Sequence, residues 1–116
     1  MNVLAPLFMA AAVAAAGDQA GFDMRCMVAT QMAHQQVEGE LKAATMLSVM
    51  FFFGRVDASM PPAELERALD AETAALKGQP LGALLQQCGR FMEGRGKALE
   101  AIGARLEAKE RAGQIG

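Results

Sequence analysis

Hydrophobic and polar positions along the chain repeat with the period of α-helices, and four helices are predicted after an apolar N-terminal segment. The first is expected over about residues 22–36, where Cys26, Ala29 or Thr30, and Ala33 fall three to four residues apart. That spacing places these side chains on one face of an amphipathic helix, with Cys26 turned inward.

The second helix is predicted over about residues 38–53 and is apolar nearly all round. One stripe combines Leu41, Ala44, Ser48 and Phe52, and most other positions are also apolar: Met46, Leu47, Val49, Met50, Phe51 and Phe53. A helix of this kind belongs in the centre of a bundle. The run 47–53 also has the composition of a strand, but no turn signal separates it from residues 43–46, which favours a helix. Gly54 is expected to cap its C-terminus.

Prolines and glycines delimit the last two helices. Pro61 and Pro62 open the third, where missing N–H groups cost nothing, and the sequence Lys-Gly-Gln-Pro over residues 77–80 ends it. The fourth helix is expected over residues 80–111. Gly94 and Gly96 are expected to kink or break it, because two glycines cost about 2 kcal/mol relative to alanine. Its apolar stripe consists of Leu81, Leu84 or Leu85, Cys88, Phe91 or Met92, Leu99, Ile102 and Leu106. No internal repeat is detected and no strand is predicted.

The first sixteen residues differ from the rest because none of them is charged. An apolar run over residues 3–13, followed by Ala14, Ala15 and Ala16, is typical of a secretory signal peptide cleaved after Ala16. The run is short for a membrane span, which needs about 20 apolar residues. An uncleaved signal anchor and a buried first helix are the alternatives. We therefore expect a signal peptide over residues 1–16, one all-α domain of four helices over 17–111, and a frayed tail over 112–116.

The chain has two cysteines, Cys26 and Cys88. In an oxidising compartment such a pair most simply forms one disulfide. The bond would close a loop of roughly 60 residues and stabilise the fold by about 4 kcal/mol. Free thiols are the main alternative, and a metal site is disfavoured because two distant cysteines and one histidine are not a ligand set. These observations predict a periplasmic or secreted protein that holds no metal ion and no cofactor.

Charge and aromatic content argue against nucleic-acid binding. The net charge is −2, with nine acids and five bases over residues 17–78, and four acids and six bases over residues 79–116. This mild asymmetry is far from the basic surface of a nucleic-acid-binding domain. The six aromatic residues are all phenylalanine, so stacking platforms for bases or sugars are poorly supplied. We expect no nucleic-acid partner, and no stable membrane span once the signal peptide is removed.

No combination of residues predicts catalysis, and the protein is expected not to be an enzyme. His34 is the one histidine, and no Ser or Cys is placed to act with it by local spacing. We expect it to be solvated or to cap a helix. No glycine-rich phosphate loop and no nucleophile elbow is present. Four acids on the third helix are interpreted as its solvated face: Glu64, Glu66, Asp70 and Glu72.

Methionine is abundant, at seven positions after residue 16. Methionine fills irregular gaps in hydrophobic cores, and it also lines apolar surfaces that bind varied ligands. Core filling is the preferred interpretation and a binding groove is the alternative. The expected function is therefore non-enzymatic binding of a protein partner or an apolar ligand.

The segment after the second helix is the candidate interaction site. Gly54, Arg55 and Asp57 are expected to form a turn there. Arg55 and Asp57 would pair with each other or cap helix ends, and contact with a partner is the alternative role.

Four features of the sequence carry a resemblance. They are the signal-like segment, Cys26, the aromatic-aromatic-x-Gly-x-x-Asp segment over residues 51–57, and Cys88. Together they resemble small two-cysteine periplasmic helical proteins of alphaproteobacteria. More remotely, the chain is similar to the acid-stress chaperones typified by HdeA and to the Tai immunity proteins, although it lacks the tryptophan of the former and the additional cysteines of the latter. The resemblance implies an acid-activated chaperone or a toxin inhibitor as alternatives to a general binding role.

Overall fold

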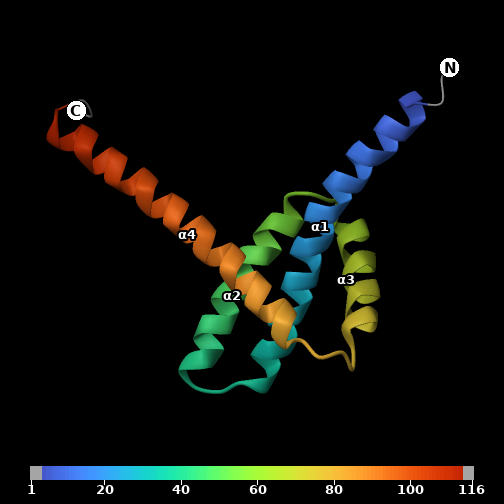
Figure 1. Cartoon of the computed structure of the whole chain (residues 1–116). Coiled ribbons are helices and arrows are strands. Elements are labelled where there is room, and N and C mark those ends of the chain that lie inside the picture. The colour runs from blue at the N-terminus through green and yellow to red at the C-terminus, as the bar shows by residue number, and fades with distance from the viewer. Residues whose placement is uncertain (1–3, 114–116) are drawn as a thin grey trace. The chain divides into compact units, whose positions relative to one another are not determined.

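The computed structural model describes the backbone of residues 4–113 and the side chains of residues 19–113. The chain is all-α and contains α1 (Leu4–Gln36), α2 (Glu40–Asp57), α3 (Pro62–Leu76) and α4 (Gly82–Arg111) (Figure 1). No strand occurs among residues 4–113. Cys26 and Cys88 are joined by a disulfide. The predicted fold class, four helices with one disulfide, is confirmed.

The helices gather into two compact units. The first, Met1–Gly82, holds α1, α2 and α3, and the second, Ala83–Gly116, consists of nearly all of α4. The sequence predicted a single domain over residues 17–111, and that range spans parts of both units. The predicted signal peptide over residues 1–16 falls on residues whose side chains lie outside the described part of the chain. Backbone helix is continuous from Leu4 to Gln36, so the predicted cleavage site after Ala16 lies inside α1.

Within the first unit, α1 is the central helix. It packs against both α2 and α3, whereas α2 and α3 touch each other much less (Figure 1). The sequence placed α2 in the centre because it is apolar all round, and that expectation was wrong. The buried face of α1 carries small side chains, with Cys26 and Ala29 both 0% exposed. Small residues let neighbouring helices approach closely, which favours α1 as the shared partner.

The core of the first unit is small and rich in methionine. Met24 and Val28 of α1, Val56 of α2 and Leu65 of α3 are buried together. Phe52 of α2 is also fully buried and makes edge-to-face contacts with the rings of Phe22 and Phe51. Partly buried apolar side chains complete the cluster: Met27, Met32, Phe53, Met60, Ala68, Leu69 and Leu76.

The ends of α3 follow the predicted proline and glycine signals. Pro61 is its N-cap and Pro62 its first residue. Lys77 is its C-cap, and Gly78 follows with φ +78°, a left-handed conformation that glycine adopts without strain. Gly39, with φ +67°, similarly makes the sharp connection between α1 and α2.

The end of α2 differs from the prediction. Gly54 does not cap the helix, which continues to Asp57 and has Ala58 as its C-cap. The carbonyl oxygen of Gly54 accepts a regular helical hydrogen bond from the Ala58 N–H at 3.2 Å. A glycine inside a helix costs about 1 kcal/mol. Burial of Val56, which is 1% exposed, contributes more than that, because a fully buried valine is worth about 1.5–3 kcal/mol.

The fourth helix is continuous through Gly94 and Gly96, so the predicted break is absent. It also carries a seven-residue repeat that the sequence analysis missed. Glycine recurs at 82, 89, 96 and 103, a large apolar residue at 85, 92, 99 and 106, and Gln or Glu at 86, 93, 100 and 107. Because seven residues span almost two full turns, each class forms a nearly straight row along the helix.

Candidate functional site

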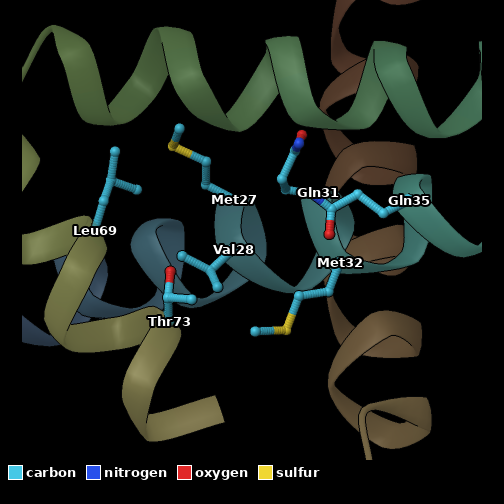
Figure 2. A pocket seen from close by; sticks show the side chains of 7 residues that line it. All are labelled: Met27, Val28, Gln31, Met32, Gln35, Leu69 and Thr73. Atoms are coloured by element: carbon cyan, nitrogen blue, oxygen red, sulfur yellow. The ribbon is translucent and has the colours of Figure 1, made fainter. Parts of the chain in front are cut away.

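An apolar cavity lies between α1 and α3 and is the best-formed candidate site of the first unit. Its volume is about 290 Å³. Figure 2 shows Leu69 and Thr73 of α3 on one side of it, and residues of α1 on the other. The α1 residues are Met27, Val28, Gln31, Met32 and Gln35. The volume falls at the lower end of the range for small-molecule sites, roughly 300–1,000 Å³.

The cavity exists because α3 fills the groove of α1 unevenly. Leu65, one turn before Leu69, is buried and packs into the core. One turn after Leu69, the corresponding position is Thr73, whose short side chain does not fill the space. Met27 and Met32 border the gap from α1. Methionine is flexible and polarizable, so these walls can adapt to apolar ligands of different shape.

The lining contains no charged side chain among its seven residues. Gln31 and Gln35 lie one turn apart on α1 and supply amide groups at the edge of an otherwise apolar wall. The third polar group is the hydroxyl of Thr73. Such a lining suits an uncharged, apolar group with few hydrogen-bonding atoms. The seven lining residues include no His, Cys, Asp, Glu, Lys or Arg.

A second cavity of about 380 Å³ continues along the same two helices. It shares Met32 and Gln35 with the apolar cavity. Its other lining residues lie at the end of α1, the end of α3 and the segment that follows: Gln36, Leu76, Lys77, Gly78, Gln79 and Leu81. The lining is more polar than that of the first cavity, and Lys77 is the one charged residue among the eight.

An ion pair fastens α1 to α2. The Nε of Arg55 donates to Oδ1 of Asp23 at 3.0 Å, and Nε2 of Gln19 donates to the same oxygen at 3.1 Å. The side chain of Asp23 is 8% exposed and that of Arg55 is 32% exposed. The guanidinium carbon of Arg55 also lies 6.0 Å from the ring centroid of Phe51, within range of a cation–π interaction.

The predicted interaction turn is therefore part of a helix. Gly54, Arg55 and Asp57 lie in the last turns of α2. Arg55 and Asp57 are two residues apart, and side chains at that spacing do not face each other on a helix. Arg55 instead reaches Asp23 of α1, which the sequence did not single out. The role of Arg55 seen here is to join two helices.

His34 also has a structural role. Its Nδ1 lies 3.1 Å from the carbonyl oxygen of Lys42 and 2.9 Å from the hydroxyl of Thr45. A carbonyl oxygen only accepts, so the contact with Lys42 is a hydrogen bond in the tautomer that carries the hydrogen on Nδ1. The Nζ of Lys42 in turn donates to the His34 carbonyl at 3.2 Å. These bonds hold the end of α1 to the start of α2.

The outer face of α2 is an exposed apolar surface. Leu47 is 70% exposed and Met50 is 58% exposed, and Met46 and Leu41 are also exposed. Leu47 and Met50 lie three residues apart, on one side of the helix. Contiguous exposed apolar side chains are typical of surfaces that contact a partner.

Two further observations bear on the class of protein. Among residues 19–113, whose side chains the structure describes, no three or more His, Cys, Asp or Glu side chains are grouped as a metal site would require. Within the same described range, no helix combines the length and apolar character needed to cross a membrane.

Methionine abundance favoured core filling, with a binding groove as the alternative. Met27 and Met32 pack against the core and also line the cavity. Thr73 and the glutamines were missed, because a gap depends on which residues face each other across two helices. Comparison with known protein families, with curated proteins and with solved structures gives no match for this chain.

Proposed function

We propose that this protein is a non-enzymatic binding protein of the periplasm or the cell exterior, which takes up an apolar ligand, or an apolar side chain of a partner, between α1 and α3. The observation that carries the proposal is the cavity bordered by Met27, Met32 and Leu69, whose lining has no charged residue. An apolar cavity with a few polar groups at its edge is the usual form of a small-molecule site.

The disulfide supports the proposed compartment. Disulfides persist in oxidising environments such as the periplasm and are rare in the cytosol. The apolar segment over residues 3–13 is the corresponding export signal in this proposal. Mass spectrometry of the exported protein tests it, because a chain starting near Gly17 with no free thiol is expected.

Binding is tested by filling the cavity. Thr73→Trp places a large ring where α3 leaves space, at a position that tolerates it because Thr and Trp have similar helix propensities. The probe is the neutral dye Nile red, whose emission rises in apolar surroundings. We expect the variant to lose at least tenfold in dye affinity while its melting temperature stays within a few degrees.

The matched control is Ala74→Trp, which adds the same ring one residue further along the same helix. Ala74 is exposed and does not line the cavity. It is expected to leave dye binding unchanged. Equal dye binding by both variants would show that the cavity is not the site.

A second candidate function is favoured by the exposed apolar face of α2. Binding of a protein through Leu47 and Met50 would suit the chaperone or toxin-inhibitor roles that the resemblance implies. Apolar dye binding between neutral pH and about pH 2–3 separates these roles, since a collapsed acid state exposes apolar surface. An acid-activated chaperone should bind unfolded proteins at low pH, whereas a toxin inhibitor should keep its near-ultraviolet spectrum.

A further inference from the structure

The two cavities between α1 and α3 differ in chemistry although they adjoin. The first has no charged residue in its lining, and the exposed residue Lys77 lines the second. Met32 and Gln35 line both, so the two spaces meet at these residues. A ligand that occupied both would pass from an apolar to a positively charged environment.

Helices α1 and α3 run in the same direction along the groove that the two cavities form. Met27 on α1 and Leu69 on α3 stand at its apolar end, and Gln36 and Lys77 stand at the other. At a rise of 1.5 Å per residue, eight to nine residues of helix span about 13 Å. This length suits one medium-length alkyl chain with a headgroup.

We propose that the natural ligand is a single-chain anionic amphiphile, with its alkyl chain in the apolar cavity and its carboxylate or phosphate headgroup beside Lys77. The proposal rests on the binding function proposed above. Charge complementarity selects the anion, because Lys77 is the one charged residue lining the second cavity and no acid lines either cavity. Gln35, Gln36 and Gln79 supply amide donors around the same headgroup.

The expected selectivity is modest because Lys77 is solvent-exposed. An exposed ion pair contributes at most about 1 kcal/mol, or roughly fivefold in affinity. Attraction of an anion and repulsion of a cation act together when two ligands with opposite headgroups are compared. We therefore expect an anionic amphiphile to bind about five- to tenfold more tightly than a cationic one with the same chain.

The test compares four ligands with the same alkyl chain: decanol, decanoate, decyl phosphate and decyltrimethylammonium. Each ligand is added below its micellar concentration to displace Nile red from the exported, disulfide-bonded protein. Decanoate and decyl phosphate should bind most tightly, decanol next and the cation last. The relative affinity of the two anions distinguishes a carboxylate from a phosphate ligand.

Variants of Lys77 make the test specific. Lys77→Gln should reduce the preference for anion over cation to less than about twofold, and Lys77→Glu should reverse it. Lys109→Gln is the control, because it removes one exposed lysine from α4 and lines neither cavity.

The outcomes separate the two proposals. If decanol binds, and Thr73→Trp blocks it, but headgroup charge and Lys77 have no effect, the binding function stands and the amphiphile proposal is wrong. If none of the four ligands displaces the dye, or the dye itself does not bind, both are wrong.

Discussion

The ion pair between Asp23 and Arg55 should stabilise the fold, and it should do so asymmetrically. In Arg55→Ala, the Asp23 carboxylate, which is 8% exposed in the intact pair, keeps the Gln19 amide as its donor among the described side chains. In Asp23→Ala, the remaining guanidinium is 32% exposed and water can solvate it. Removal of the arginine is therefore expected to cost more than removal of the aspartate.

The magnitudes lie between two limits. Exposed ion pairs contribute about 0–1 kcal/mol, and breaking a buried pair costs about 3–5 kcal/mol. This pair has one buried and one half-exposed member, joined through a single nitrogen at 3.0 Å. We expect a loss of about 2–3 kcal/mol in unfolding free energy for Arg55→Ala and about 1–2 kcal/mol for Asp23→Ala. The double variant should lose about 1–2 kcal/mol less than the sum.

The assay is urea denaturation followed by far-ultraviolet circular dichroism, since the chain has no Trp or Tyr for intrinsic fluorescence. The control is the same cycle on Glu93 and Lys97, an exposed pair one turn apart on α4 at 3.5 Å. Its coupling should be no more than about 0.5 kcal/mol. If the loss in the double variant equals the sum of the losses in Asp23→Ala and Arg55→Ala to within about 0.5 kcal/mol, the two residues are not coupled. A larger loss for Asp23→Ala than for Arg55→Ala would refute the argument from burial.

Three further predictions concern the disulfide and the glycines. Replacing both cysteines by alanine should lower the free energy of unfolding by about 4 kcal/mol, because Cys26 and Cys88 close a loop of roughly 60 residues. Reduced wild-type protein should lose a similar amount in urea denaturation. A loss below about 1 kcal/mol would show that the disulfide constrains the unfolded chain little. Gly96→Ala should stabilise α4 by about 1 kcal/mol, since the added methyl group meets no atom within 4 Å and alanine favours helix; a lower melting temperature would contradict this. In Gly39→Ala the added methyl group also meets no atom within 4 Å, but the φ of +67° is unfavourable for alanine. The substitution should cost about 1–2 kcal/mol of unfolding free energy, so the melting temperature of the variant should fall.

Local sequence signals predicted the helices well where they act without distant partners. Pro61, Pro62 and Gly78 mark the ends of α3 because their backbone preferences operate within one turn. Gly54 was a misleading signal of the same kind. A glycine preference of about 1 kcal/mol is outweighed when the residues beyond it are buried, as Val56 is. That burial depends on α1 and α3, so residues near Gly54 do not reveal it.

Pairings between distant segments were harder to predict. The sequence predicts that Arg55 pairs with Asp57 or caps a helix end, whereas its guanidinium donates to Asp23, 32 residues away. The cysteine pair is the exception, because only one pairing of two cysteines exists. The repeat in α4 is a property of the sequence alone, but the apolar stripe does not reveal it, because the glycines at a spacing of seven residues carry part of the pattern.

The candidate site shows why a methionine-rich face does not by itself separate core from pocket. Met24 and Met27 lie on the same helix in similar sequence surroundings, yet Met24 is 5% exposed in the core and Met27 borders a cavity. The difference comes from the facing helix, where Leu65 fills its part of the interface and Thr73 does not. The space of about 290 Å³ is open to solvent and is bordered by the flexible thioethers of Met27 and Met32, so an apolar group can enter it without unfolding the core. Thr73 is the residue whose size most directly decides whether such a group fits.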